Sequence, residues 1–139
     1  MTIYFELEEN PKGTAQMKGT SFQGGRIHHY EKKEVKFTRN MYHLKIVSAA
    51  GGLAKLPHFD GAVSCSVTFF YSIKQRKKWG LPKTSKPDCD NMVKLLLDVM
   101  TGLHIWDDDS QVAHLEVSKF YAEKPAILIV AEPMEGGGS

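Results

Sequence analysis

The chain has 139 residues, which suits one domain with a single hydrophobic core. Its 18 basic and 16 acidic residues give a formal net charge of +2, so the total charge neither identifies nor excludes a polyanionic partner. No apolar run approaches the length of a membrane span, nothing repeats internally, and residues 1–9 lack a secretory pattern. Cys65 and Cys89 are too few for a disulfide framework, so we expect a reducing, cytoplasmic location without membrane contact.

The N-terminal half predicts a strand, a loop and a helix. Apolar residues occupy every second position of 2–8, which predicts a strand with one wet face. Residues 9–29 contain several glycines and read as a long loop, with Gly24 and Gly25 as the strongest break. Residues 32–50 then predict a helix that closes at the following glycine pair.

The C-terminal half predicts a strand, a helix and two further strands. Residues 63–73 are rich in β-branched and aromatic side chains, and 112–121 alternate apolar with polar ones. We expect 126–131 to form a hairpin with 112–121. The order β-α-β-α-β-β predicts one α+β (α/β) domain over 1–135, with a mixed β-sheet and two main helices. The last four residues, 136–139, are expected to be a flexible tail.

The second helix lies between two groups of acids. Pro87 fits its first turn, and Asp88 and Asp90 suit the positive end of the helix dipole. Gly102 is expected to end it. One face is apolar at spacings of three and four, through Met92, Val93, Leu95, Leu96, Val99, Met100 and Leu103. The opposite face carries Asp90, Lys94, Asp98 and Thr101.

The acids at the two ends of this helix point to a metal site. Asp88 and Asp90 lie at its start, and Asp107, Asp108 and Asp109 follow its end. Carboxylates brought together repel one another, so a fold that gathers them usually adds a divalent cation. Two plainer readings stay open, a solvated helix face with acid and base one turn apart and an acidic turn before a strand. Trp106 favours the functional reading, because it would anchor the charged turn on apolar structure.

A basic run precedes the first acid group and contains no acid. Its members are Lys74, Arg76, Lys77, Lys78, Lys83 and Lys86. A basic segment beside an acidic metal site suits a polyanion that is cut at its backbone. Trp79 lies within the run and is expected either to stack on an exposed base or to fix the loop. The alternative is an ordinary solvated loop.

These residues together resemble the signature of the RusA family of Holliday junction resolvases. That signature is an aspartate pair one residue apart followed by asparagine, a lysine four residues after the second aspartate, and a further helical aspartate. Tryptophan, two acids, a small residue, glutamine and valine follow. The matching positions are Asp88, Asp90, Asn91, Lys94, Asp98, Trp106, Asp108, Asp109, Gln111, Val112 and Lys119. The match covers about 86–121, and Asp107 is an extra acid where the family often has an apolar residue.

The resemblance implies a crossover junction endodeoxyribonuclease, a phosphodiester hydrolase of DNA recombination and repair in a bacterial or phage-infected cell. It implies paired symmetric nicks in a four-way DNA junction by a homodimer that uses Mg²⁺, with Mn²⁺ as a substitute. The catalytic residues would be Asp88, Asp90, Lys94 and Asp109, and the metal ligands Asp88, Asp90, Asp108 and Asp109. DNA contacts would come from Lys74, Arg76, Lys77, Lys78, Lys83, Lys86 and Lys119. The alternative is a branched-DNA binding module whose acids hold a structural ion.

Overall fold

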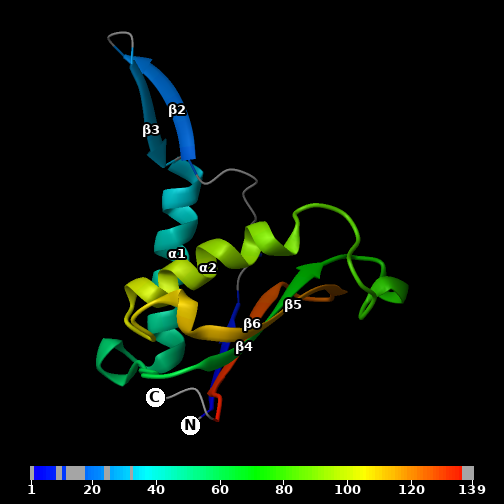
Figure 1. Cartoon of the computed structure of the whole chain (residues 1–139). Coiled ribbons are helices and arrows are strands. Elements are labelled where there is room, and N and C mark those ends of the chain that lie inside the picture. Colours follow the sequence, from blue (N-terminus) through cyan, green and yellow to red (C-terminus); the bar gives the residue numbers. More distant parts are fainter. Residues whose placement is uncertain (1, 9–10, 12–17, 24–25, 32, 136–139) are drawn as a thin grey trace.

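The structure, a computed structural model, describes residues 2–8, 11, 18–23, 26–31 and 33–135. Its strands and helices, in chain order, are β1 (Ile3–Leu7), β2 (Lys18–Gln23), β3 (Arg26–Glu31), α1 (Lys33–Ala50), β4 (Val63–Ser72), α2 (Cys89–Gly102), β5 (Val112–Ala122) and β6 (Ala126–Pro133). Short turns of 3₁₀ helix lie at Leu53–Lys55, Arg76–Lys78 and Asp109–Gln111. The predicted α+β domain with a mixed sheet and two main helices is confirmed (Figure 1).

The main sheet has the strand order β1-β6-β4-β5. β4 pairs in parallel with β5, and β6 is antiparallel to both β1 and β4. The predicted hairpin between 112–121 and 126–131 is therefore wrong, because β4 lies between these strands. Burial explains the order: every second residue of β6 from Ile127 to Ala131 is fully buried, whereas no residue of β5 is. The strand with more apolar surface takes the central position.

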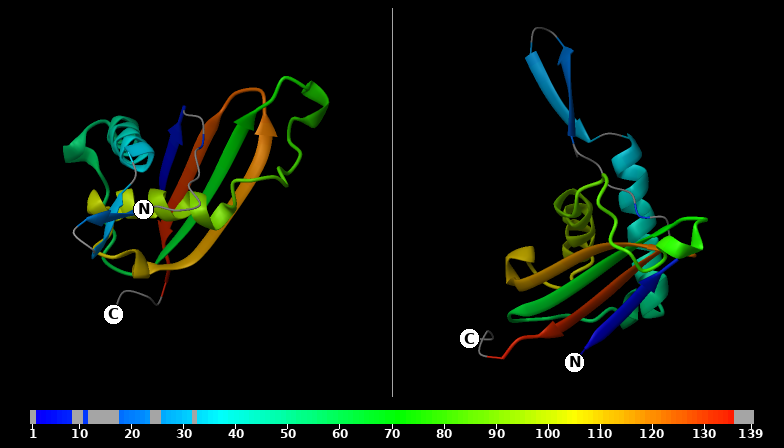
Figure 2. Two further views of the ribbon diagram at one scale, coloured as in Figure 1. Left: turned by 90° about the horizontal axis from the view of Figure 1, so that it is seen from above. Right: turned by 90° about the vertical axis from the view of Figure 1, so that its right-hand side faces the viewer.

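Both helices cover the same face of the main sheet (Figure 2). α1 packs against α2 and β1, and α2 also contacts β5. The apolar stripe of α2 is buried as predicted, and Leu96 and Met100 are completely inaccessible. Among the described residues, no helix is long and apolar enough to cross a membrane.

The predicted loop over 9–29 is wrong in its second half. β2 and β3 form an antiparallel hairpin, in which Gln23 pairs with Arg26. The β-forming residues in 20–22 and 27–30 explain the pairing, although glycines nearby obscure it in the sequence. The hairpin projects from the N-terminal end of α1, away from the sheet (Figure 1). The expected break at Gly24 and Gly25 lies outside the described residues. Of residues 9–17, only Pro11 is described.

The two ends of α2 differ from the prediction by a few residues. Asp88 has extended backbone angles, φ −74° and ψ 146°, and forms the N-cap, so Pro87 lies before the helix and not in its first turn. At the other end, Gly102 is the last helical residue, but its backbone does not adopt the left-handed conformation. His104 takes that conformation, with φ 58°.

Candidate active site

The polar face of α2 carries a row of charged side chains. Asp90, Lys94 and Asp98 are spaced four residues apart, so each lies one turn after the last, and Asp90 and Lys94 are exposed. Within the part of the chain that the structure describes, Lys94 forms no ion pair with Asp90 or Asp98. The ammonium group of Lys94 is therefore available to an anionic ligand.

Trp106 anchors the acidic turn to the core, as the sequence predicts. Its side chain is completely buried. The indole Nε1 donates a hydrogen bond to Thr101 Oγ1 at 2.7 Å, and that hydroxyl donates to the Leu97 carbonyl at 3.0 Å. The three aspartates that follow Trp106 are thus held close to the C-terminal half of α2.

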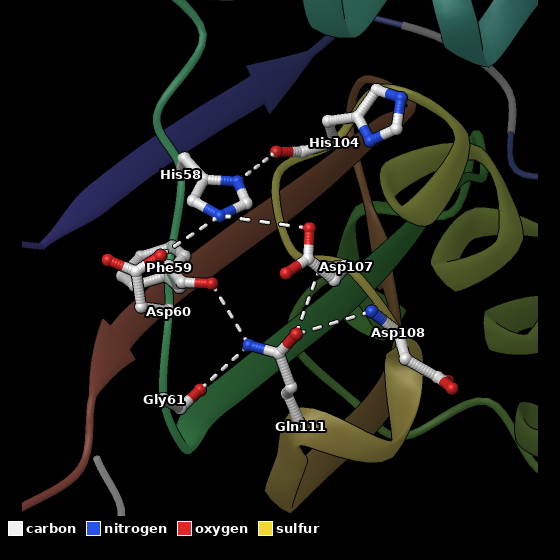
Figure 3. A network of polar contacts seen from close by, with 8 residues as sticks. All are labelled: His58, Phe59, Asp60, Gly61, His104, Asp107, Asp108 and Gln111. Carbon is white, nitrogen blue, oxygen red and sulfur yellow. Dashed lines mark hydrogen bonds and ion pairs between the residues drawn. The ribbon is translucent and has the colours of Figure 1, made fainter. Parts of the chain in front are cut away.

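Gln111 fixes the shape of the same turn, a role that the sequence reasoning missed. Its Nε2 donates to the carbonyl oxygens of Phe59 and Gly61, at 2.9 and 3.0 Å (Figure 3). Its Oε1 accepts from the backbone N–H groups of Asp107 and Asp108, at 2.9 and 3.2 Å. Asp108 Oδ1 also accepts from the Ser110 N–H, and Asp108 and Gln111 form a capping box. An acid followed three residues later by glutamine is the sequence signal for this cap.

His58 joins the network from the segment before β4. Its Nδ1 donates to the His104 carbonyl at 2.6 Å, and its Nε2 lies 3.3 Å from Asp60 Oδ1 and 3.9 Å from Asp107 Oδ1 (Figure 3). The hydrogen bond to His104, followed by the charges of Asp107 and Asp60, raises the pKa of His58 above its ordinary value. Asp107 thus has His58 as a partner. No sequence signal announces His58, because its partner His104 lies 46 residues away.

Asp108 and Asp109 lie close enough for each carboxylate to shift the pKa of the other. A hydrogen bond from the Ser110 N–H, and then one shared with Asp109, lower the pKa of Asp108. Slight desolvation, and then the neighbouring carboxylates of Asp108 and Asp98, raise the pKa of Asp109. Asp98 on α2 therefore acts on the acidic turn, although we did not predict it as a site residue. Like charges at this spacing resist joint ionisation unless a cation lies between them.

The donor chemistry of this turn fits a hard divalent cation, because it offers only carboxylate oxygens and carries unbalanced negative charge. Asp88 and Asp90, however, lie at the other end of α2. Asp90 is two turns, or about 12 Å along the axis, from Asp98. Among the described residues, no three His, Cys, Asp or Glu side chains gather closely enough to hold a metal ion. The structure places the predicted ligands in two groups, and the four-acid ligand set stays a prediction.

Two of the predicted DNA-binding lysines contact the segment before α2. Lys83 Nζ donates to Ser85 Oγ at 2.6 Å and lies 5.0 and 5.4 Å from the ring centres of Tyr71 and Tyr121. Lys119 Nζ donates to two main-chain carbonyl oxygens of the same segment. Both lysines are only partly exposed, and their role in DNA binding stays a prediction.

The other basic residues lie on an exposed arm between β4 and α2. Lys74, Arg76, Lys77, Lys78 and Lys86 are all exposed. Trp79 fixes this arm, since its Nε1 donates to the Ile73 carbonyl at 2.8 Å, and the Arg76 guanidinium lies 5.8 Å from its ring centre. The arm also pairs with the end of β5, through Gly80 N–H to Tyr121 O and Tyr121 N–H to Leu81 O. The basic charges are thus presented on a tethered loop.

A carboxylate-bearing helix beside a basic arm is the arrangement expected of a nuclease. A family model described as "Endodeoxyribonuclease RusA" matches residues 8–132, which is most of the chain. The chain belongs to the RusA family of endodeoxyribonucleases and is an enzyme, as the sequence predicts.

Two curated relatives match the chain, and the first of them carries the family's name. The chain is 39% identical over 125 residues to "Crossover junction endodeoxyribonuclease rusA" of Lactococcus phage r1t, and the match covers 90% of this chain and 92% of the phage protein. It is also 47% identical over 58 residues to "Uncharacterized protein YqaN" of Bacillus subtilis (strain 168). That second match covers 41% of this chain and 40% of the relative.

The contacts of His58 predict a pH dependence of stability. Because its pKa is raised in the folded state above 6.5, the protonated imidazole stabilises the fold. This contribution is fully present below pH 6.5 and is lost as the pH rises through the folded pKa. NMR titration of the His58 ring measures that pKa, and Asp107→Asn should lower it by removing one attractive charge. A His58 pKa at or below 6.5 in the wild-type protein would contradict the prediction.

Proposed function

We propose that the protein is a magnesium-dependent Holliday junction resolvase, which cuts four-way DNA junctions by paired symmetric nicks during recombination and repair. It would act in the cytoplasm of a bacterial or phage-infected cell. The observation that carries this proposal is the RusA family match over residues 8–132 together with the complete set of acids and Lys94. A branched-DNA binding module is the second candidate. Lys94, which forms no ion pair with Asp90 or Asp98, argues against it, because binding without cleavage gives no reason to keep that group.

The metal ligands would be Asp88 and Asp90 at one end of α2, and Asp108 and Asp109 at the other. Hydrolysis of a phosphodiester needs an activated water, neutralised phosphoryl oxygens and a stabilised leaving 3′-oxygen. Bound magnesium supplies Lewis acidity for all three requirements. Lys94 would orient the phosphate or the attacking water as a point charge, since it lies one helical turn from both Asp90 and Asp98. Asp107 would stay outside the ligand set, with His58 as its partner.

The exposed arm would bind the DNA backbone. Its residues are Lys74, Arg76, Lys77, Lys78 and Lys86, and Lys83 is a further predicted contact. Lysine and arginine that neutralise phosphates release condensed counterions, which gives affinity without sequence selectivity. Selectivity for junctions would then come from the shape of the substrate.

The active unit would be a homodimer. A junction presents two equivalent strands that must be cut at symmetric positions, whereas one chain carries one set of acids. Two-fold symmetry in the substrate is met most simply by two-fold symmetry in the protein.

Removal of a ligand should separate cleavage from binding. We expect Asp90→Asn or Asp109→Asn to abolish junction cleavage in Mg²⁺ while leaving binding in Ca²⁺ unchanged or tighter, because the change removes both the metal and some repulsion of phosphate. Asp107→Asn is the matched control and should cut at near the wild-type rate. More than about a tenth of the wild-type rate, a barrier change below about 1.4 kcal/mol, would exclude the substituted residue as a ligand.

Loss of two arm lysines should weaken binding to every DNA shape. Joint replacement of Lys77 and Lys78 by alanine should make the slope of log affinity against log salt concentration shallower. The expected change in slope is that of losing roughly two phosphate contacts. The control replaces Lys36 and Lys55, which are exposed lysines outside the arm. Gel-shift titrations at several salt concentrations measure the slope. An unchanged slope would show that the arm is only solvated surface.

The dimer should be visible both in solution and in the products. Light scattering of the free protein should give twice the chain mass, and a supercoil-extruded cruciform should be cut on both strands within one binding event. A stable monomer that resolves junctions without concentration dependence, or products dominated by single nicks, would refute the homodimer.

A further inference from the structure

Lys119 is attached to three alternate residues of the segment that leads into α2. Its Nζ donates to the carbonyl oxygens of Ser85 and Pro87, at 2.7 Å each. Its own carbonyl oxygen accepts from the Lys83 N–H at 3.0 Å. Hydrogen bonds from a charged donor are about twice as strong as neutral ones. One side chain therefore fixes the main chain on both sides of Lys86.

The position of Lys119 in the sheet makes this attachment rigid. On β5 it is the register partner of Phe69 on β4, whose side chain is completely buried under the helices. Lys119 lies on the same helix-covered face and is only partly exposed. Its ammonium group thus reaches the loop from a sheet position. A catalytic constellation is held most accurately by residues on such regular elements.

Asp88 is the residue whose freedom depends on this loop. An aspartate at an N-cap usually accepts a hydrogen bond from the second or third helical N–H group, which occupies its carboxylate. The Asp88 carbonyl accepts from the Met92 N–H at 3.2 Å, as in an ordinary helix start. Its side chain, however, makes no cap hydrogen bond and is exposed. The helix therefore begins at a carboxylate that remains open to a ligand.

We propose that Lys119 is a positioning residue for Asp88. By fixing the Ser85 and Pro87 carbonyls, it holds the start of α2 in place without a side-chain cap, so that the Asp88 carboxylate is kept for the reaction. This role rests on the proposed function, because it assigns Asp88 to the chemistry. This positioning role differs from a phosphate contact, because the Ser85 and Pro87 carbonyls already accept two of the three hydrogens of the Lys119 ammonium group.

The test compares Lys119→Met, Lys119→Arg and Lys78→Met with the wild-type protein. Methionine keeps the length of the lysine side chain without its charge or donors, and arginine can donate to both carbonyls. We expect Lys119→Met to slow cleavage of saturating junction by about ten- to a hundredfold, as for a small displacement of a reacting group, and to leave binding and its salt slope unchanged. Lys119→Arg should restore most of the rate. Lys78→Met should do the reverse, with weaker binding and an unchanged rate at saturation.

Amide hydrogen exchange in the free protein tests the attachment separately from the reaction. In Lys119→Met, residues 84–91 should exchange at least about tenfold faster, while α1 and the sheet keep their protection. If Lys119→Met is too unstable to measure, the same comparison with Lys119→Arg decides, since arginine should retain the protection. Unchanged exchange in Lys119→Met, or kinetics that match those of Lys78→Met, would overturn the proposal. A wild-type protein that cuts no junction would instead refute the proposed function, and the exchange result would still decide the attachment.

Discussion

The parallel pairing of β4 with β5 is the constraint on which the site depends. Parallel neighbours need a long crossover, and α2 with its two flanking segments supplies it. The crossover must return along one face of the sheet. The apolar stripe of α2 is therefore buried against the sheet, and the polar face of α2 is turned away from the sheet. Asp90, Lys94 and Asp98 therefore form a row on the polar face above the core, in which Asp90 and Lys94 are exposed.

The two ends of the crossover are fastened by different means. At the start, a lysine of β5 holds two carbonyl oxygens of an extended segment. At the end, a buried tryptophan and one glutamine hold the acidic turn, and the glutamine alone makes four hydrogen bonds, to the backbone of Phe59, Gly61, Asp107 and Asp108. These side chains satisfy backbone groups that the turns would otherwise leave without partners. The carboxylates themselves are little used in these contacts, so they remain available for chemistry.

Local patterns predicted much of the fold, because α2, β4 and β6 carry periodic apolar residues. The weakly amphipathic α1 was predicted with the help of the glycine pair that follows it. The burial of Trp106 was also predictable, because a tryptophan directly before three aspartates is expected to anchor the charged turn on apolar structure. The hairpin of 126–131 with 112–121 was wrong because strand order depends on which strand buries more surface, a comparison across the whole sheet. The contact of His58 with His104 and those of Lys119 with Ser85 and Pro87 could not be predicted, since each joins residues more than thirty positions apart. The β2–β3 hairpin was missed because its glycines read as a loop.

The division of the acids into two groups follows from electrostatics. The charges of Asp108 and Asp98 already raise the pKa of Asp109. Two further carboxylates at the same point would make its ionisation still less favourable. Only a counter-charge makes such a gathering favourable, and Lys94 supplies one, about 6 Å along the helix from Asp90 and from Asp98. A lysine suits this position better than an arginine, because a compact ammonium on a flexible stem can turn toward either group or toward a phosphate. The basic arm adds positive charge that is tethered to the end of β5 and does not neutralise the acids. Positive and negative charges are thus kept on separate segments, as an enzyme that holds a polyanion and cuts its backbone requires.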